Sequence, residues 1–185
     1  MLFKRARPVK FADLDGSPIT YGNRFRVEGS CVTIGADQDQ IELVLKLLLR
    51  FRQPPFRVTW EHRVSRTPGV DEGLYTLDGI RHVDEVRGFL EEFRDSFEGD
   101  ARHVLRIYAH TGRTEIVYDE HNLILLEGGI EGVPEYLREL GFSDGLGEMP
   151  YPHVHKYHDR FDKAPVAMKK YAEWVYASLP DDSEL

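Results

Sequence analysis

Hydrophobic patterns of the strand type and of the helix type follow one another in runs along this chain. An opening set of strand patterns precedes the first helix, two strands precede the second helix, and three strands, a short helix, an extended segment and a last helix follow. A doubly wound parallel sheet needs a helix between successive strands, and this order does not provide one. The order predicts an α+β fold with a mostly antiparallel sheet and helices packed mainly on one face.

The most apolar helical pattern is predicted to begin at Asp37, which can cap the free amides, with Gln40 completing a capping box. It ends before Pro54 and Pro55, because proline blocks the helical geometry of the residue before it. Apolar residues cover most sides of this helix: Ile41, Leu43, Val44, Leu45, Leu47, Leu48 and Leu49. We therefore expect it to be central and largely buried.

The remaining pattern predicts helices over about 81–97 and 164–178, and a short helix that contains Pro134 and stops at Gly141. Similar sequences end two of the strand runs, at 77–80 and at 126–130. A weak internal αββ duplication is one interpretation, and chance recurrence of turn sequences is the other.

Length and composition indicate a single α+β domain over residues 1–185, with a frayed tail at 180–185. Cys31 is the single cysteine, so no intramolecular disulfide can form. The basic N-terminus is not followed by an apolar stretch of signal-peptide length, and no apolar run is long enough to span a bilayer. These features predict a cytoplasmic protein that does not enter a membrane.

The formal net charge is −8. Such a charge repels phosphates at long range, which makes nucleic acid an unlikely partner, and it favours solubility. A surface adapted to a basic protein partner is the less favoured interpretation.

Three of the eight histidines lie within the six residues 153–158. On a strand over 151–158, His153 and His155 project to the same side, together with Tyr151 and Tyr157. Two histidines at this spacing can bind one divalent metal ion, and Asp159 is a candidate for a further ligand.

We favour another interpretation of this segment over a metal site. In it, the segment is an edge strand with solvated polar side chains, and Asp162 is the N-cap of the last helix. The favoured expectation for cofactors is therefore none, with a divalent metal as the alternative. A pH-responsive surface is a third interpretation, because histidines titrate near neutral pH.

Other polar residues carry weaker signals. His62 falls on the apolar face of a strand over 56–64, where a hydrogen-bonded core histidine is the usual outcome. A three-stranded meander is predicted over 104–110, 114–118 and 123–127. His110 and the 119–121 sequence Asp-Glu-His lie near its turns, and they could line a site if this meander lies beside the histidine-rich strand.

The sequence Asp13-Leu-Asp-Gly-Ser17 resembles the signature of the haloacid-dehalogenase phosphotransferases, in which the first aspartate is a nucleophile. This chain has Ser17 where that family usually has threonine, and Pro18 where it has an apolar residue. The favoured interpretation is a hairpin turn at Asp15-Gly16.

Three functions remain open. The favoured one is a non-catalytic protein-binding or regulatory domain of the inhibitor or immunity type, with another protein as its partner and an unspecified oligomeric state. Its predicted binding surface consists of Arg57, Arg63, Tyr151, Tyr157 and His158.

The alternative is a metal-dependent or His/Asp-based hydrolase centred on residues 151–162, with His155, Asp159 and His62 as candidate catalytic residues. The second alternative is a nucleic-acid binder that uses the arginines of the sheet.

Overall fold

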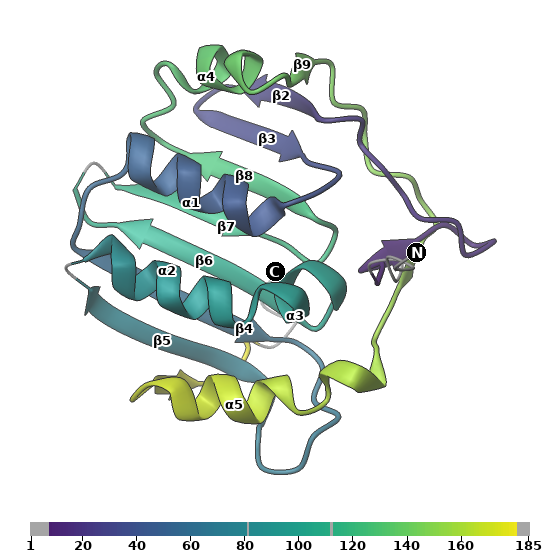
Figure 1. Cartoon of the computed structure of the whole chain (residues 1–185), viewed down its shortest axis with the longest axis vertical. Helices are drawn as coiled ribbons and strands as arrows, with labels where there is room; N and C mark the ends of the chain where they lie inside the picture. Colours follow the sequence, from purple (N-terminus) through teal and green to yellow (C-terminus); the bar gives the residue numbers. More distant parts are fainter. Residues whose placement is uncertain (1–7, 81, 112, 181–185) are drawn as a thin grey trace, which may run out of the picture.

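The computed structural model describes residues 8–80, 82–111 and 113–180, and the large sheet in it has the order β11-β5-β4-β6-β7-β8-β3-β2-β9 (Figure 1). Its strands are β2 Arg24–Glu28, β3 Cys31–Gly35, β4 Phe56–His62, β5 Gly73–Ile80, β6 His103–Ala109, β7 Thr114–Tyr118, β8 Leu123–Glu127, β9 Ser143–Asp144 and β11 Val175–Ala177. The pair β2–β9 is parallel, and the other neighbouring pairs are antiparallel.

The helices are α1 Gln40–Phe51, α2 Val83–Glu92, α3 Arg94–Gly99, α4 Val133–Glu139 and α5 Ala164–Tyr171, with a 3-10 turn η1 at Asp159–Phe161. Figure 1 shows α1, α2 and α3 lying across the same face of the large sheet. The predicted α+β fold with a mostly antiparallel sheet is confirmed. The similar sequences at 77–80 and 126–130 fall at the ends of β5 and β8, and their duplication stays a prediction.

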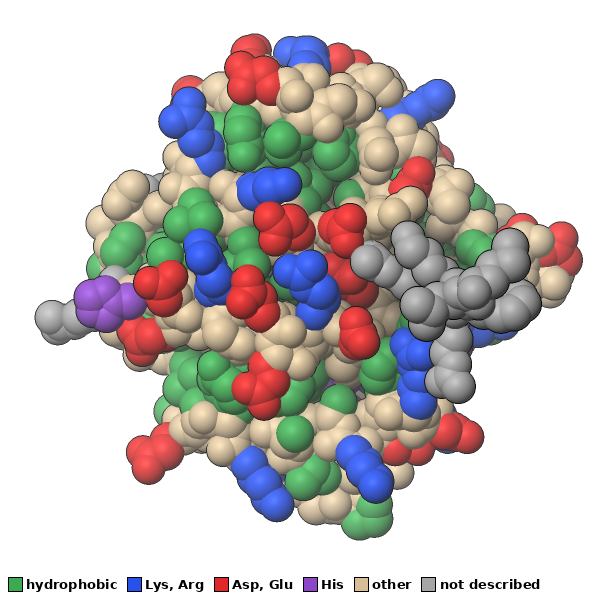
Figure 2. All heavy atoms as spheres, viewed as in Figure 1, with side chains coloured by type: hydrophobic (Ala, Val, Ile, Leu, Met, Phe, Trp, Pro, Cys, Tyr) green, Lys and Arg blue, Asp and Glu red, His purple; other side chains and the backbone are tan. Residues whose placement is uncertain are grey.

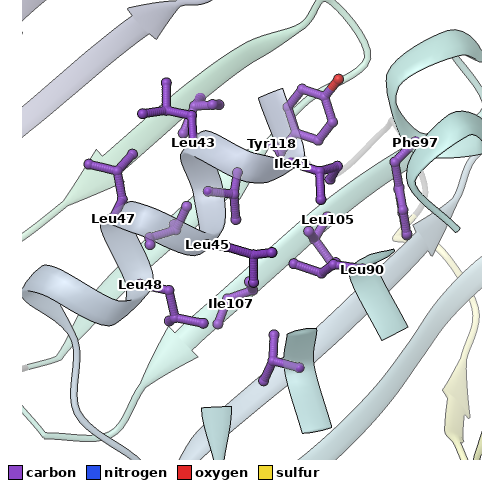
Figure 3. Close-up of a cluster of buried hydrophobic side chains, with 14 of the residues drawn as sticks. Ile41, Leu43, Leu45, Leu47, Leu48, Leu90, Phe97, Leu105, Ile107 and Tyr118 are labelled. Atoms are coloured by element: carbon purple, nitrogen blue, oxygen red, sulfur yellow. The ribbon is translucent and has the colours of Figure 1, made fainter. Parts of the chain in front are cut away.

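The hydrophobic core lies between these helices and the sheet. Figure 3 shows Leu45 and Leu48 of α1 on the side of the helix that faces Leu105 and Ile107 of β6, with Leu90 of α2 and Phe97 of α3 closing one side. The expectation that α1 is central and largely buried is confirmed for its apolar residues from Ile41 to Leu48, whereas Leu49 is 48 % exposed. Among the described residues, every helix is too short or too polar to traverse a bilayer.

The predicted start of α1 is wrong. The helix begins at Gln40, three residues after Asp37. The carboxylate of Asp37 accepts hydrogen bonds from the backbone amides of Tyr21 (2.7 Å) and Gly22 (3.1 Å), and Gln40 donates its side-chain amide to the carbonyl of Ala36. Asp37 therefore stabilises the loop at residues 21–22 through these hydrogen bonds and does not cap the helix.

The prediction of a single helix over 81–97 is wrong, and the helix predicted over 164–178 is too long. The first is interrupted at Phe93, whose backbone is not helical, and gives α2 and α3; residue 81 lies outside the described residues. The second ends at Tyr171, and the residues after Trp174 form β11 at the edge of the sheet. Pairing with β5 satisfies the backbone of β11 and places Tyr176 against Tyr75.

A second, two-stranded sheet positions the histidine-rich segment. Strand β1, Phe11–Ala12, pairs antiparallel with β10, Val154–His155. The predicted strand over 151–158 is therefore mostly an extended loop. The turn predicted at Asp15-Gly16 does form, since the amide of Asp13 donates to the carbonyl of Ser17.

A buried ion network attaches the same segment to the large sheet. Arg102 is fully buried and donates to both carboxylate oxygens of Asp100 (2.8 and 2.9 Å) and to Asp162 (2.8 Å). Asp100 also accepts the backbone amide of His158, and Arg102 donates to the carbonyl of the same residue. Asp162 is thus a partner of Arg102, and the prediction that it caps the last helix is wrong, because Lys163 occupies that position.

Two histidines are buried side by side at the adjoining ends of β4 and β6. His62 pairs in register with His103, and their rings stack with centroids 5.3 Å apart. Trp60 donates its indole N–H to Nδ1 of His103 (2.9 Å). Within the described residues, neither ring nitrogen of His62 has a hydrogen-bond partner, so the expected hydrogen-bonded core histidine is not observed. Burial, followed by the charge of Arg102, lowers the pKa of His62 to about 4.

We predict that Arg102→Met lowers the free energy of unfolding by about 3–5 kcal/mol, because it leaves the Asp100 carboxylate buried without its cation. Arg57→Met is the matched control, since Arg57 pairs with Asp78 at the surface and such pairs contribute up to about 1 kcal/mol. Urea denaturation of both variants checks this, and equal losses in the two would contradict it.

We also predict a loss of stability in acid that depends on His62. Its folded pKa is lower than the unfolded value of 6.5, so the unfolded chain takes up the proton first. Stability is unaffected by this group above pH 6.5 and falls between pH 6.5 and 4, by up to about 1.4 kcal/mol per pH unit. Denaturant titrations across this range should show a shallower slope of stability against pH for His62→Leu than for the wild type. The same dependence of the free energy of unfolding on pH in the wild type and in His62→Leu would contradict this prediction.

Candidate functional site: a cluster of three histidines

Three imidazoles converge where the small sheet meets the turn between β7 and β8. His121 belongs to that turn, His153 immediately precedes β10, and His155 lies in β10. One ligand atom from each lies within 4.8 Å of those of the other two. The ring centroids are 4.8–5.2 Å apart, and all three side chains are partly buried. Of the clustered residues, His153 and His155 were predicted as metal ligands.

A single carboxylate shapes the turn that carries His121. One oxygen of Asp119 accepts the backbone amides of His121 (2.9 Å) and Leu123 (2.8 Å). Asn122 adopts a left-handed backbone conformation (φ 63°), which asparagine tolerates better than most residues. This closed turn places the His121 ring beside β10 even though 34 residues separate His121 from His155.

Register with β1 sets the other two rings. Phe11 is the partner of His155, and Ala12 is the partner of Val154. The Phe11 ring meets His121 and His153 edge to face, with centroids 5.6 and 5.9 Å apart, and forms an apolar wall behind them. The hydroxyl of Tyr21 donates a hydrogen bond to the carbonyl of His121 (2.8 Å), and the Tyr21 ring stacks on Phe11, so the turn is attached to the same apolar wall.

Hydrogen bonds at the outer nitrogens determine which nitrogens face the centre of the cluster. Nδ1 of His121 lies 3.2 Å from the second oxygen of Asp119, and Nδ1 of His153 lies 2.9 Å from the carbonyl oxygen of Pro150. Both acceptors require an N–H at Nδ1, and in the neutral form of each ring this places the lone pair on Nε2. Nε2 of His155 lies 3.0 Å from Nε2 of His121, a contact that needs either a shared proton or a cation.

The electrostatic environment keeps His155 neutral. Burial lowers the pKa of His155 below its usual value, and the neighbouring His121 and His153 lower it further. A neutral imidazole is the form that binds a metal ion. The outer hydrogen bonds to Asp119 and Pro150 have the arrangement that orients metal-binding histidines in proteins.

Acidic and basic groups surround the cluster on the sheet side. Glu120 is buried and pairs with Arg63 (2.6 Å), and its carboxylate lies 4.0 Å from Nδ1 of His121. Lys10 is fully buried, donates to the carbonyl of Asp119, and lies over the ring of Tyr118 at 4.0 Å. Burial lowers the pKa of Lys10 to about 8, against the opposing charges of Asp119 and Glu120.

The other predicted site residues lie elsewhere. Asp159 is exposed and pairs with Arg66 at 2.5 Å, outside the three-histidine group. His62 stacks on His103 in the core. His158 points its ring at the carbonyl of Val9, which gives it a structural contact.

The predicted binding surface is divided between two regions. Arg57 pairs with Asp78, and Arg63 pairs with both Glu61 and Glu120, so each of the two charges is matched by a neighbour. Tyr151 is 90 % exposed next to His153. Tyr157 is partly exposed, and its carbonyl accepts a hydrogen bond from Arg66.

His121 is not among the metal ligands predicted from the sequence. Its signal was the Asp-Glu-His sequence at 119–121 in a turn of the meander, which pointed to a site only if the meander lies next to the histidine-rich strand. The sheet order and the β1–β10 pairing provide that neighbourhood.

Comparisons with protein-family models, with curated proteins and with solved structures find no significant match to this chain. The arrangement of His121, His153 and His155 is therefore the basis on which a function can be argued.

Proposed function

We propose that this protein is a metal-dependent hydrolase whose divalent ion, zinc in the first instance, is bound by His121, His153 and His155. The observation that carries the proposal is the convergence of three imidazoles, two of which have Nδ1 beside a hydrogen-bond acceptor, so that Nε2 is the ligand atom each of these two rings can offer.

The type of ligand favours zinc. Zinc binds imidazole nitrogen at about 2.0–2.1 Å, whereas magnesium and calcium prefer oxygen ligands. Three protein ligands on a tetrahedral ion leave one position for water, which is the pattern of catalytic zinc sites. The acidic residues lie on the outer, Nδ1 side of His121, where Asp119 acts as a positioning residue.

A zinc ion held by His121, His153 and His155 would supply a water-derived nucleophile near neutral pH, because zinc lowers the pKa of bound water to about 7. The chain's own residues would then orient the site and exclude water from one side. Phe11 covers the back of the rings, and the exposed ring of Tyr151 beside His153 offers a surface on which a substrate can rest.

The protein-binding function favoured by the sequence has support of a different kind. Strand β11 is an edge strand with all three residues exposed, and Val175 is 72 % exposed. Such an edge can accept a strand from a partner protein. We place it second, because an exposed edge specifies no chemistry, whereas the histidine cluster does. Nucleic-acid binding ranks third, since the sheet arginines Arg57, Arg63 and Arg106 are paired with acids. A cytoplasmic location fits each proposal.

Zinc titration followed by calorimetry tests the metal site. We expect one zinc ion per chain for the wild type, and a loss of at least about 100-fold in affinity for His153→Ala and His155→Ala, because each removes one of three ligands. His110→Ala is the matched control, since His110 is an exposed histidine that pairs with Asp78, away from the cluster.

Two outcomes would count against this assignment. One is zinc binding that His153→Ala and His155→Ala leave unchanged. The other is a wild-type chain that takes up no zinc, cobalt or manganese after chelator treatment and dialysis.

Hydrolysis of 4-nitrophenyl acetate by the zinc-loaded protein tests the reaction. We expect the wild-type rate of hydrolysis to increase with pH through about pH 7, where water bound to zinc would lose a proton. In His155→Ala the rate should equal the background rate. The increase should persist in His110→Ala. A zinc-loaded wild type that hydrolyses neither this ester nor 4-nitrophenyl phosphodiesters above the rate of free zinc would refute the catalytic part of the proposal.

A further inference from the structure

A recess lies between α2 and α5, above β4 and β5. It has a volume of about 470 Å³, within the range of small-molecule sites. Val58 and Leu77 are register partners and form its floor. Figure 2 shows hydrophobic side chains reaching the surface in the region between these two helices. None of the residues that line this recess belongs to the histidine cluster.

Three aromatic rings line the recess. Phe89 of α2 lies 5.2 Å from Tyr171 and 5.2 Å from Trp174, measured between ring centroids, at interplanar angles of 57° and 59°. Trp174 is fixed by a hydrogen bond from its indole to the carbonyl of Met168 (2.8 Å). The absence of a side chain at Gly88 allows the hydroxyl of Tyr171 to approach α2, where a Cβ would lie 3.0 Å from it.

The charges at this recess have one sign. Its described lining residues include Asp78 and Glu85 and no lysine or arginine. Asp78 pairs with Arg57 and lies 2.9 Å from Nε2 of His110, while among the described residues the carboxylate of Glu85 accepts a hydrogen bond from the backbone amide of His82. Rings inclined to one another, with a carboxylate beside them, form the type of site that binds alkylated ammonium ions through cation–π attraction.

We propose that this recess, bounded by Phe89, Tyr171, Trp174 and Glu85, binds a small organic cation of the quaternary ammonium class. The rings of Tyr171 and Trp174 provide electron-rich faces, the buried ring of Phe89 excludes water behind them, and Glu85 provides the opposing charge. An apolar molecule of the same shape would gain only the burial of its surface. The selectivity for charge therefore distinguishes this site from a simple hydrophobic recess. The proposal is independent of the metal centre.

Calorimetric titration of the full chain with choline tests the proposal, with 3,3-dimethylbutan-1-ol as the uncharged molecule of nearly the same shape. We expect choline to bind at least about tenfold more tightly than the alcohol. Glu85→Gln should weaken choline binding several-fold and leave the alcohol unaffected. Glu91→Gln is the matched control, because Glu91 is an exposed acid of the same helix that does not line the recess.

Trp174→Leu should abolish the preference for choline over the alcohol. Circular dichroism checks that this variant folds. If it does not fold, Glu85→Gln provides the test instead, because that substitution removes a charge without removing an apolar contact. Equal affinity for choline and the alcohol, or no binding of either, would overturn the proposal. Tighter binding of a trimethyllysine peptide than of choline would overturn the assignment to a small ligand. Removal of zinc with a chelator should leave choline binding unchanged, which separates this result from the fate of the metal site.

Discussion

The buried guanidinium of Arg102 determines where the histidine-rich part of the chain lies. A cation with no exposed surface needs carboxylates and carbonyls around it, and the chain supplies Asp100 from its own loop and Asp162 from the far side of the histidine segment. The backbone of His158 is bound at both its amide and its carbonyl by the same pair. This network and the β1–β10 pairing together hold the segment against the large sheet.

Once the segment is held there, the chemistry of the three histidines follows from their outer hydrogen bonds. Asp119 closes the β7–β8 turn with one oxygen and faces Nδ1 of His121 with the other. The same carboxylate thus builds the backbone turn and orients a ring. Such double use couples the shape of the site to the stability of the turn, so the cluster is preorganised before any ligand arrives.

Much of the fold could be predicted because its signals are local. The apolar pattern of α1 and the three strands of the meander depend on residue spacing within a dozen residues, and both appear as expected. The failures have long-range causes. Asp37 had the sequence of a helix cap, but the loop at Tyr21 uses its carboxylate. Residues 175–177 continued a helical pattern, but pairing with the edge of β5 makes them a strand.

The site was predictable in part for the same reason. His153 and His155 share a side because side chains alternate along a strand, which is a local rule, whereas the approach of His121 depends on sheet order and on the long-range pairing of β1 with β10. Asp159 was assigned by proximity in sequence alone, and an ion pair with Arg66 directs it away. His62 and His103 show the opposite case, in which polar residues follow the apolar alternation into the core.

X-ray absorption at the zinc edge of the loaded protein is the most direct test of the histidine cluster as a metal centre. The arrangement of His121, His153 and His155 predicts three imidazole nitrogens at about 2.0–2.1 Å and one further oxygen. A first shell made mainly of carboxylate oxygens, or one that keeps the same number of imidazoles in His155→Ala, would contradict the account.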